Sequence, residues 1–108
     1  MISPKSFTQL ALSLPETESA LHFDRIAFKV VKNRIFATLH EKSMSANIVL
    51  SAKEQNAFCE YNFEGIYPVP NKWGEKGWTT FDLTKVSKEV IAEALNSAYS
   101  DVIKQKSK

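Results

Sequence analysis

The sequence predicts an α+β fold in two layers, a mostly antiparallel sheet of about five strands with helices packed on one face. Two observations predict this fold. Apolar residues recur at helical spacing near both ends of the chain. Between them lie short runs rich in β-branched and aromatic residues, separated by turn residues. The expected order is helix, four strands, helix, strand and helix, in a single domain over residues 1–108.

The first helix is predicted to begin after Ser3. A serine side chain caps helices well, and Pro4 suits the first helical position because that position has no partner for an N–H. Pro15 ends the helix because proline disfavours helical angles in the residue before it. The apolar stripe between these ends consists of Phe7, Leu10, Ala11 and Leu14.

Four strands are then expected, over residues 17–23, 26–31, 34–40 and 46–50. The second and third strands would form a hairpin with Lys32 and Asn33 as a two-residue turn. This turn sets a register in which every cross-strand pair on one face is apolar, so that face should meet the helices. The pairs are Val30 with Ile35, Phe28 with Ala37, and Ile26 with Leu39.

The opposite face of the same hairpin is expected to be open and mostly basic or polar. Its residues are Arg25, Ala27, Lys29, Val31, Arg34, Phe36, Thr38 and His40. Phe36 would be the one exposed aromatic residue on this face.

In the second half, Ser51 and Glu54 fit a capping box for a helix that ends near residue 60. An aromatic-rich connection over 61–73 leads to a strand over 77–83, and Ser87 caps a last helix with a wide apolar stripe. Residues 68–83 contain both tryptophans, two of the three glycines and two of the four prolines. Such a concentration predicts one specified loop that leads into a strand.

The amino-acid composition limits the classes of function and the cellular locations that we expect for this protein. The formal charge of +2 is mild for a nucleic-acid binder, so such a role would need a local basic patch. A single cysteine, Cys59, indicates a reducing compartment, and neither a signal peptide nor a run long enough to span a bilayer is evident. We therefore expect a cytoplasmic protein with no membrane partner.

The sequence points to no reaction. It has no phosphate-binding glycine loop and no nucleophile elbow. Cys59 is interpreted as a buried free thiol, and His22 and His40 lack the spacing of metal ligands. We therefore predict no catalytic residue, no metal site, no cofactor and no enzyme activity.

Several short motifs occur in a recognisable order along nearly the whole chain. They are Leu14-Pro15-Glu16, His22-Phe23, Ala27–Val30 with Arg34–Ala37, Gly77-Trp78-Thr79 and Leu95–Val102. Together they resemble the YjbR/MmcQ family of small bacterial proteins. The chain departs from the family at Lys32-Asn33, where the family often has glycine, and at Ala98-Tyr99, where it often has Ser-Tyr. The resemblance implies a two-layer α+β fold and a DNA-binding label that rests on fold comparison.

These observations lead to a predicted nucleic-acid surface on the open sheet face. Its cations would contact phosphates, His40 would donate a hydrogen bond, and aromatic rings would stack on bases. The residues are Arg25, Lys29, Arg34, Phe36, His40, Lys72, Trp73, Lys76 and Trp78. The expected binding to DNA is weak and dominated by backbone charge.

Two other interpretations remain open. In the first, Trp73 and Trp78 line an aromatic groove for a protein or a small ligand. In the second, the aromatic residues pack against one another and the cations only keep the face soluble. An exposed aromatic face would also fit a homodimer.

Overall fold

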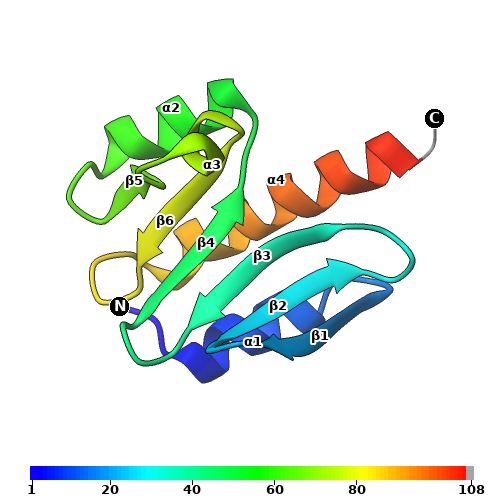
Figure 1. The fold of residues 1–108 in the computed structure, drawn as a ribbon. Coiled ribbons are helices and arrows are strands. Elements are labelled where there is room, and N and C mark those ends of the chain that lie inside the picture. Colours follow the sequence, from blue (N-terminus) through cyan, green and yellow to red (C-terminus); the bar gives the residue numbers. More distant parts are fainter. Residues whose placement is uncertain (107–108) are drawn as a thin grey trace.

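A six-stranded antiparallel sheet runs through the computed structural model, which describes residues 1–106 (Figure 1). The spatial order is β1-β2-β3-β4-β6-β5. The strands are β1 (Thr17–His22), β2 (Arg25–Val30), β3 (Ile35–His40), β4 (Ser45–Val49), β5 (Ile66–Pro68) and β6 (Trp78–Asp82). The helices are α1 (Pro4–Leu12), α2 (Ala52–Tyr61), α3 (Lys72–Glu75) and α4 (Lys88–Lys106).

Three helices cover one face of this sheet. Figure 1 shows α1, α2 and α4 behind the strands, while the face toward the viewer carries no such helix. The core between the layers is fully buried and mostly aromatic and aliphatic. Its largest side chains include Phe7, Phe28, Phe36, Leu39, Ile48, Phe81 and Leu95. The predicted α+β class and the one-sided placement of the helices are confirmed.

The predicted helix starts are also confirmed. The Ser3 hydroxyl accepts a hydrogen bond from the Ser6 N–H at 3.1 Å. Ser51 accepts from the Glu54 N–H at 3.2 Å. Ser87 accepts from the Val90 N–H, also at 3.2 Å. Each bond satisfies one of the N–H groups that a helix start leaves unpaired, which is worth about 1 kcal/mol in typical proteins.

The sheet has one strand more than predicted. β5 lies in the aromatic connection and pairs with β6, with Ile66 opposite Phe81. This strand is three residues long and ends in Pro68, so it gives no alternating pattern in the sequence. The short helix α3 follows it and was likewise not predicted.

The β2–β3 hairpin follows the predicted register only near its open end. Ile26 lies opposite Leu39 and Phe28 opposite Ala37, as expected, but Lys29 then lies opposite Ile35. The predicted pair of Val30 with Ile35 is therefore wrong. One residue of β3 is extra at this point, which makes a β-bulge.

The turn of this hairpin is longer than the predicted Lys32-Asn33 pair. The strands stop at Val30 and resume at Ile35, and the Asn33 N–H donates to the Val30 carbonyl at 2.8 Å. Lys32 takes a positive φ of 62° within the turn. The predicted register assumed a two-residue turn, so it does not apply to a connection of four residues.

The extra residue of the bulge is Phe36, and the bulge reverses its predicted exposure. Phe36 is fully buried and makes an edge-to-face contact with Tyr99 of α4, with 6.2 Å between the ring centroids. Ile35 is placed on the open face instead, and 37% of it is exposed. The expectation that Phe36 stacks on a ligand is therefore wrong. Burial of a phenylalanine side chain is worth about 2–3 kcal/mol, which favours the bulged arrangement.

Candidate binding groove on the open sheet face

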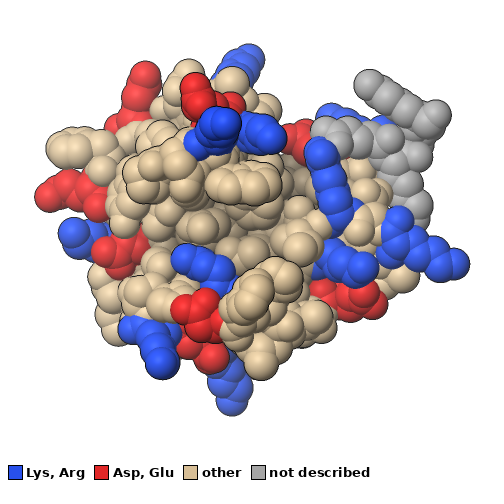
Figure 2. Space-filling model, viewed as in Figure 1, with Lys and Arg blue, Asp and Glu red and all other residues tan. Residues whose placement is uncertain are grey.

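A groove of about 700 Å³ lies on the open face, across β3, β4 and β6 and up to α3. Figure 2 shows uncharged residues over most of the middle of this face, with Lys and Arg side chains around it. The lining residues are His22, Arg25, Arg34, Ile35, Thr38, Asn47, Val49, Val69, Trp73, Lys76 and Trp78. They include three permanent cations and no carboxylate, so the groove favours an anionic ligand with apolar or aromatic parts.

Trp73 forms one wall of the groove. The Asn71 side chain caps α3 by accepting a hydrogen bond from the Trp73 N–H at 2.8 Å. The Lys76 ammonium lies 5.2 Å from the centroid of a Trp73 ring, within cation–π range. Trp73 is 56% exposed, so its ring is held in place yet remains accessible.

Two glycines allow the backbone of α3 and of the turn before β6 to lie close to neighbouring backbone. A Cβ at Gly74 would lie 2.0 Å from the Val69 carbonyl oxygen, and a Cβ at Gly77 would lie 2.0 Å from that of Leu50. Gly77 also has a φ of 104°, which side-chain-bearing residues rarely adopt. Both glycines are thus required to place Trp73 and Trp78 at the groove.

Gln55 of α2 fixes the same segment from the helical side. Its amide nitrogen lies 3.0 Å from the Gly74 carbonyl, 3.3 Å from the Trp78 carbonyl and 3.0 Å from the Thr79 hydroxyl. Trp78 lies opposite Val49 in the β4–β6 ladder, and this register directs it to the open face. The wall formed by α3 and β6 is therefore held from both layers.

The cations that line the groove form no ion pair in the described part of the chain, although the charge of Arg25 helps to lower the pKa of Asp24. Within residues 1–106, Arg25, Arg34 and Lys76 take part in no ion pair. The Arg25 guanidinium has one polar contact, 3.5 Å from the Thr38 hydroxyl. Their charges are therefore available to a ligand.

Four of the predicted site residues lie outside the groove, and the buried Phe36 is one of them. Lys29 forms an ion pair with Glu18 of β1, with 3.6 Å between nitrogen and oxygen. Lys72 is exposed on α3 but does not line the groove. His40 is held by other side chains. The groove brings together Arg25, Arg34, Trp73, Lys76 and Trp78.

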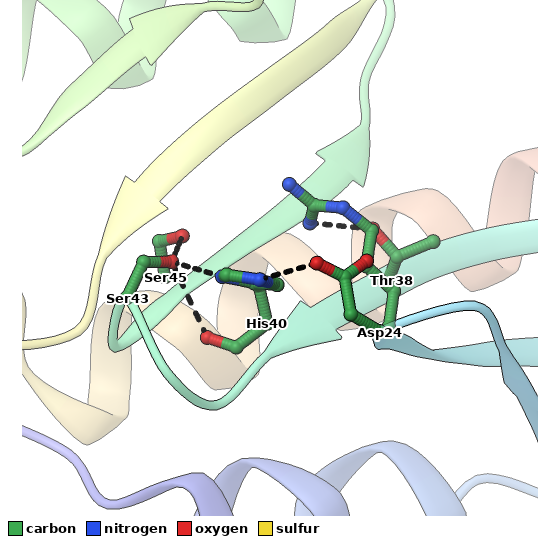
Figure 3. Close-up of polar contacts among 6 residues, drawn as sticks. Asp24, Thr38, His40, Ser43 and Ser45 are labelled. Atoms are coloured by element: carbon green, nitrogen blue, oxygen red, sulfur yellow. Dashed lines mark hydrogen bonds and ion pairs between the residues drawn. The ribbon is translucent and has the colours of Figure 1, made fainter.

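His40 joins two hairpin turns through a chain of hydrogen bonds (Figure 3). Its Nε2 lies 2.9 Å from an Asp24 carboxylate oxygen, and its Nδ1 lies 2.6 Å from the Ser43 hydroxyl. The Ser43 hydroxyl lies 2.7 Å from that of Ser45. A neutral imidazole with its proton on Nε2 satisfies this chain. The hydrogen bond from His40 is the main reason that the pKa of Asp24 lies below its ordinary value of 3.8.

The order carboxylate, imidazole and hydroxyl is that of a serine hydrolase relay. The Asp24 side chain is 68% exposed, however, and neither Asp24 nor Ser43 lines the groove. We therefore assign the chain to holding the β1–β2 and β3–β4 turns together.

A family model named YjbR matches residues 12–101 of the sequence. The chain belongs to the YjbR family. The fold of this YjbR-family chain is similar to that in the crystal structure of the Deinococcus radiodurans protein DR2400, described by its domain DUF419. The TM-score is 0.83 at 22% sequence identity, over 98% of this chain and 82% of the other. No curated protein matches the chain.

Other chemical candidates in the YjbR-family chain have little support. Burial raises the pKa of the Cys59 thiol, which works against a reactive thiolate. Within residues 1–106, no three His, Cys, Asp or Glu side chains are gathered as metal ligands would be. In the same range, no helix has the length and apolar character needed to cross a membrane.

Six lining residues of the YjbR-family groove were not among the predicted site residues, namely His22, Ile35, Thr38, Asn47, Val49 and Val69. Val49 could have been found, because it alternates with the buried Ile48 along a predicted strand. Ile35 could not, because the bulge moves it to the open face. Val69 lies beside the short strand β5, for which the sequence carries no signal.

Proposed function

We propose that the groove binds single-stranded nucleic acid at low affinity. One observation carries the proposal: two tryptophans and three unpaired cations line a single groove that has no carboxylate in its lining. Aromatic rings that stack on bases beside cations that neutralise phosphates are typical of single-strand binding surfaces. The DNA-binding label implied by the family resemblance agrees with this chemistry.

Each residue has a defined role in the proposed complex. Trp73 offers an accessible ring on which a base stacks. Arg25, Arg34 and Lys76, which line the same groove, contact phosphates of the strand. Because only three cations take part, the slope of log affinity against log salt concentration should be about −2 for a single strand.

Duplex DNA should bind less well than a single strand. A base can reach Trp73 and Trp78 only if it is unstacked from its neighbours, which costs a few kcal/mol in a duplex. The duplex would therefore use the cations alone. Stacking on an aromatic ring is worth about 1–3 kcal/mol per base, so the expected preference for a single strand is roughly tenfold.

The test is a titration of the protein with fluorescent single-stranded and duplex oligonucleotides at low salt. The double variant Arg34→Glu/Lys76→Glu should lower the affinity at least tenfold, since it reverses two phosphate contacts. Lys5→Glu/Lys88→Glu, on exposed positions of α1 and α4, changes the net charge equally and should leave binding nearly unchanged. Trp73→Ala should weaken the single strand roughly tenfold and the duplex little.

Two results would overturn the proposal. One is no binding of either nucleic acid at protein concentrations on the order of tens of micromolar, where even non-specific binders associate at low salt. The other is an equal loss of affinity in the groove variant and in the control, because net charge alone would then explain the binding.

A second candidate function is an apolar small ligand or peptide. It is favoured by the aliphatic residues that line the groove, Ile35, Val49 and Val69. The Arg34→Glu/Lys76→Glu variant separates the two functions. A neutral apolar ligand should still bind to it and should quench the tryptophan fluorescence, whereas nucleic acid should not bind.

A further inference from the structure

The outer edge of β1 is an unprotected sheet edge. No strand lies beyond β1 in residues 1–106, and β1 pairs with β2 over six consecutive residues without a bulge (Figure 1). The opposite edge, β5, is three residues long and contains Pro68. Proteins commonly protect an edge with a short strand, a proline, a lysine or a bulge. β5 has the first two protections, whereas β1 has none of the four, and its one carboxylate, on Glu18, forms an ion pair with Lys29 of β2.

The hydrogen-bonding groups of β1 that point outward follow from its pairing with β2. The Val31 N–H donates to the Glu16 carbonyl at 2.7 Å, in the same register as the β1–β2 ladder. In an antiparallel ladder, every second residue uses its N–H and C=O toward the neighbour. Residues 16, 18, 20 and 22 therefore bond to β2. Thr17, Ser19 and Leu21 present their backbone groups outward.

Two large apolar side chains accompany this edge. Leu21 is 77% exposed, and Phe23, in the turn that follows β1, is 89% exposed. Every residue of β1 from Glu18 to His22 is exposed. A partner strand along β1 would reduce the exposure of these two apolar side chains.

We propose that two copies of the chain associate by antiparallel pairing of their β1 strands, with a two-fold axis at Ala20. Glu18 of each copy then lies opposite His22 of the other, where the carboxylate can accept a hydrogen bond from an imidazole N–H. Ser19 of one copy exchanges backbone hydrogen bonds with Leu21 of the other. The small Ala20 side chains meet at the axis, where bulk would be least tolerated.

The hydrogen-bond pattern restricts the possible registers. The outward groups belong to odd-numbered residues, so an odd-numbered residue must lie opposite an odd-numbered one. A shift by two residues in one direction places Glu18 opposite Ala20, where it has no hydrogen-bonding partner in the other copy. A shift in the other direction places His22 opposite Ala20. Among these registers, only the one centred on Ala20 places Glu18 of each copy opposite His22 of the other.

The proposed dimer joins the two sheets into one, with both open faces on the same side, because paired residues of an antiparallel ladder lie on the same face. It does not depend on the function of the groove. The interface is small, so we expect a weak dimer that forms at concentrations on the order of 100 μM.

Cysteine crosslinking tests both the pairing and its register, in a background that carries Cys59→Ser. At a non-hydrogen-bonded antiparallel pair the two Cα atoms are about 4.5 Å apart, which suits a disulfide. With oxidised glutathione as the oxidant, Ala20→Cys should form a covalent dimer at least tenfold faster than Ser19→Cys or Leu21→Cys. Equal rates at the three positions, or the fastest rate at 19 or 21, would overturn the register.

Two further variants test the association itself by sedimentation. Ser19→Pro removes an outward N–H and leaves the β1–β2 ladder intact, so it should give a folded monomer. Glu18→Lys and His22→Glu should each weaken the dimer roughly tenfold, and the double variant should restore it, because it places an ammonium group opposite a carboxylate. A wild-type chain that stays monomeric at about 1 mM, or a double variant weaker than both single ones, would overturn the proposal.

Discussion

The two ends of the open face are held by different forces. At the groove, two glycines with no room for a Cβ and the Gln55 side chain of α2 hold the wall that carries Trp73 and Trp78. At the β1 edge, most side chains are exposed, and the side-chain contacts include an ion pair between Glu18 and Lys29, the hydrogen bonds of His40 and those of Thr17 to the end of α1. Exposed ion pairs contribute little stability. The groove is therefore a preformed surface, whereas the β1 edge is a surface that a partner can complete.

The largest expected difference in stability is between alanine substitutions of two phenylalanines. Phe36→Ala should lower the free energy of unfolding by about 3–5 kcal/mol, because Phe36 is fully buried against Tyr99. Phe23→Ala, at the β1 end, should change it by less than about 0.5 kcal/mol, because Phe23 is exposed. Urea denaturation of both variants measures the difference. Equal effects would show that Phe36 is not part of the core.

This pair of residues also shows what the sequence can and cannot predict. Alternation along the strands correctly paired Phe28 with Ala37, and the cap residues correctly marked three helix starts. Alternation assumes an unbroken ladder, so it placed Phe36 on the open face. A bulge depends on contacts with a distant helix, here Tyr99 of α4, and no pattern local to β3 records them.

The candidate site was predicted in part for a similar reason. The density of glycine, proline and tryptophan in residues 68–83 marked the loop that forms the groove wall, and the structure places both tryptophans there. Lys29 and His40 were predicted on the open face beside Arg25. Their acidic neighbours, Glu18 and Asp24, come from β1 and its turn, whose register against β2 was not predicted.

The next contrast concerns the backbone of the groove wall. Gly77→Ala should cost about 3 kcal/mol of stability, because the new Cβ meets the Leu50 carbonyl oxygen at a positive φ. Ser19→Ala in β1 should cost less than about 0.5 kcal/mol, because Ser19 is exposed on an edge strand. Thermal denaturation provides both values.

A Gly77→Ala variant that kept the stability of the wild type would still test the geometry of the groove wall. The chain would then have moved Leu50 or Trp78 to make room, so the tryptophan fluorescence and the binding of the single strand should both change. Unchanged stability together with unchanged binding would contradict the close approach of β6 to the end of β4.

The smallest expected effect lies at the β1 end, where His40 holds Asp24. The folded chain lowers the pKa of this carboxyl below 3.8, so its contribution to stability is present above that pH and is lost as the pH falls through the folded pKa. His40→Ala removes the main cause of the shift and should raise the pKa of Asp24 toward 3.8, as measured by NMR titration of the carboxyl carbon. Asp82 provides the internal control. The hydrogen bond from Thr84 is the main cause that lowers its pKa, so it should not respond to His40→Ala. An unchanged Asp24 pKa in this variant would mean that His40 does not join the two turns. The β1–β2 turn would then be held by its backbone pairing alone.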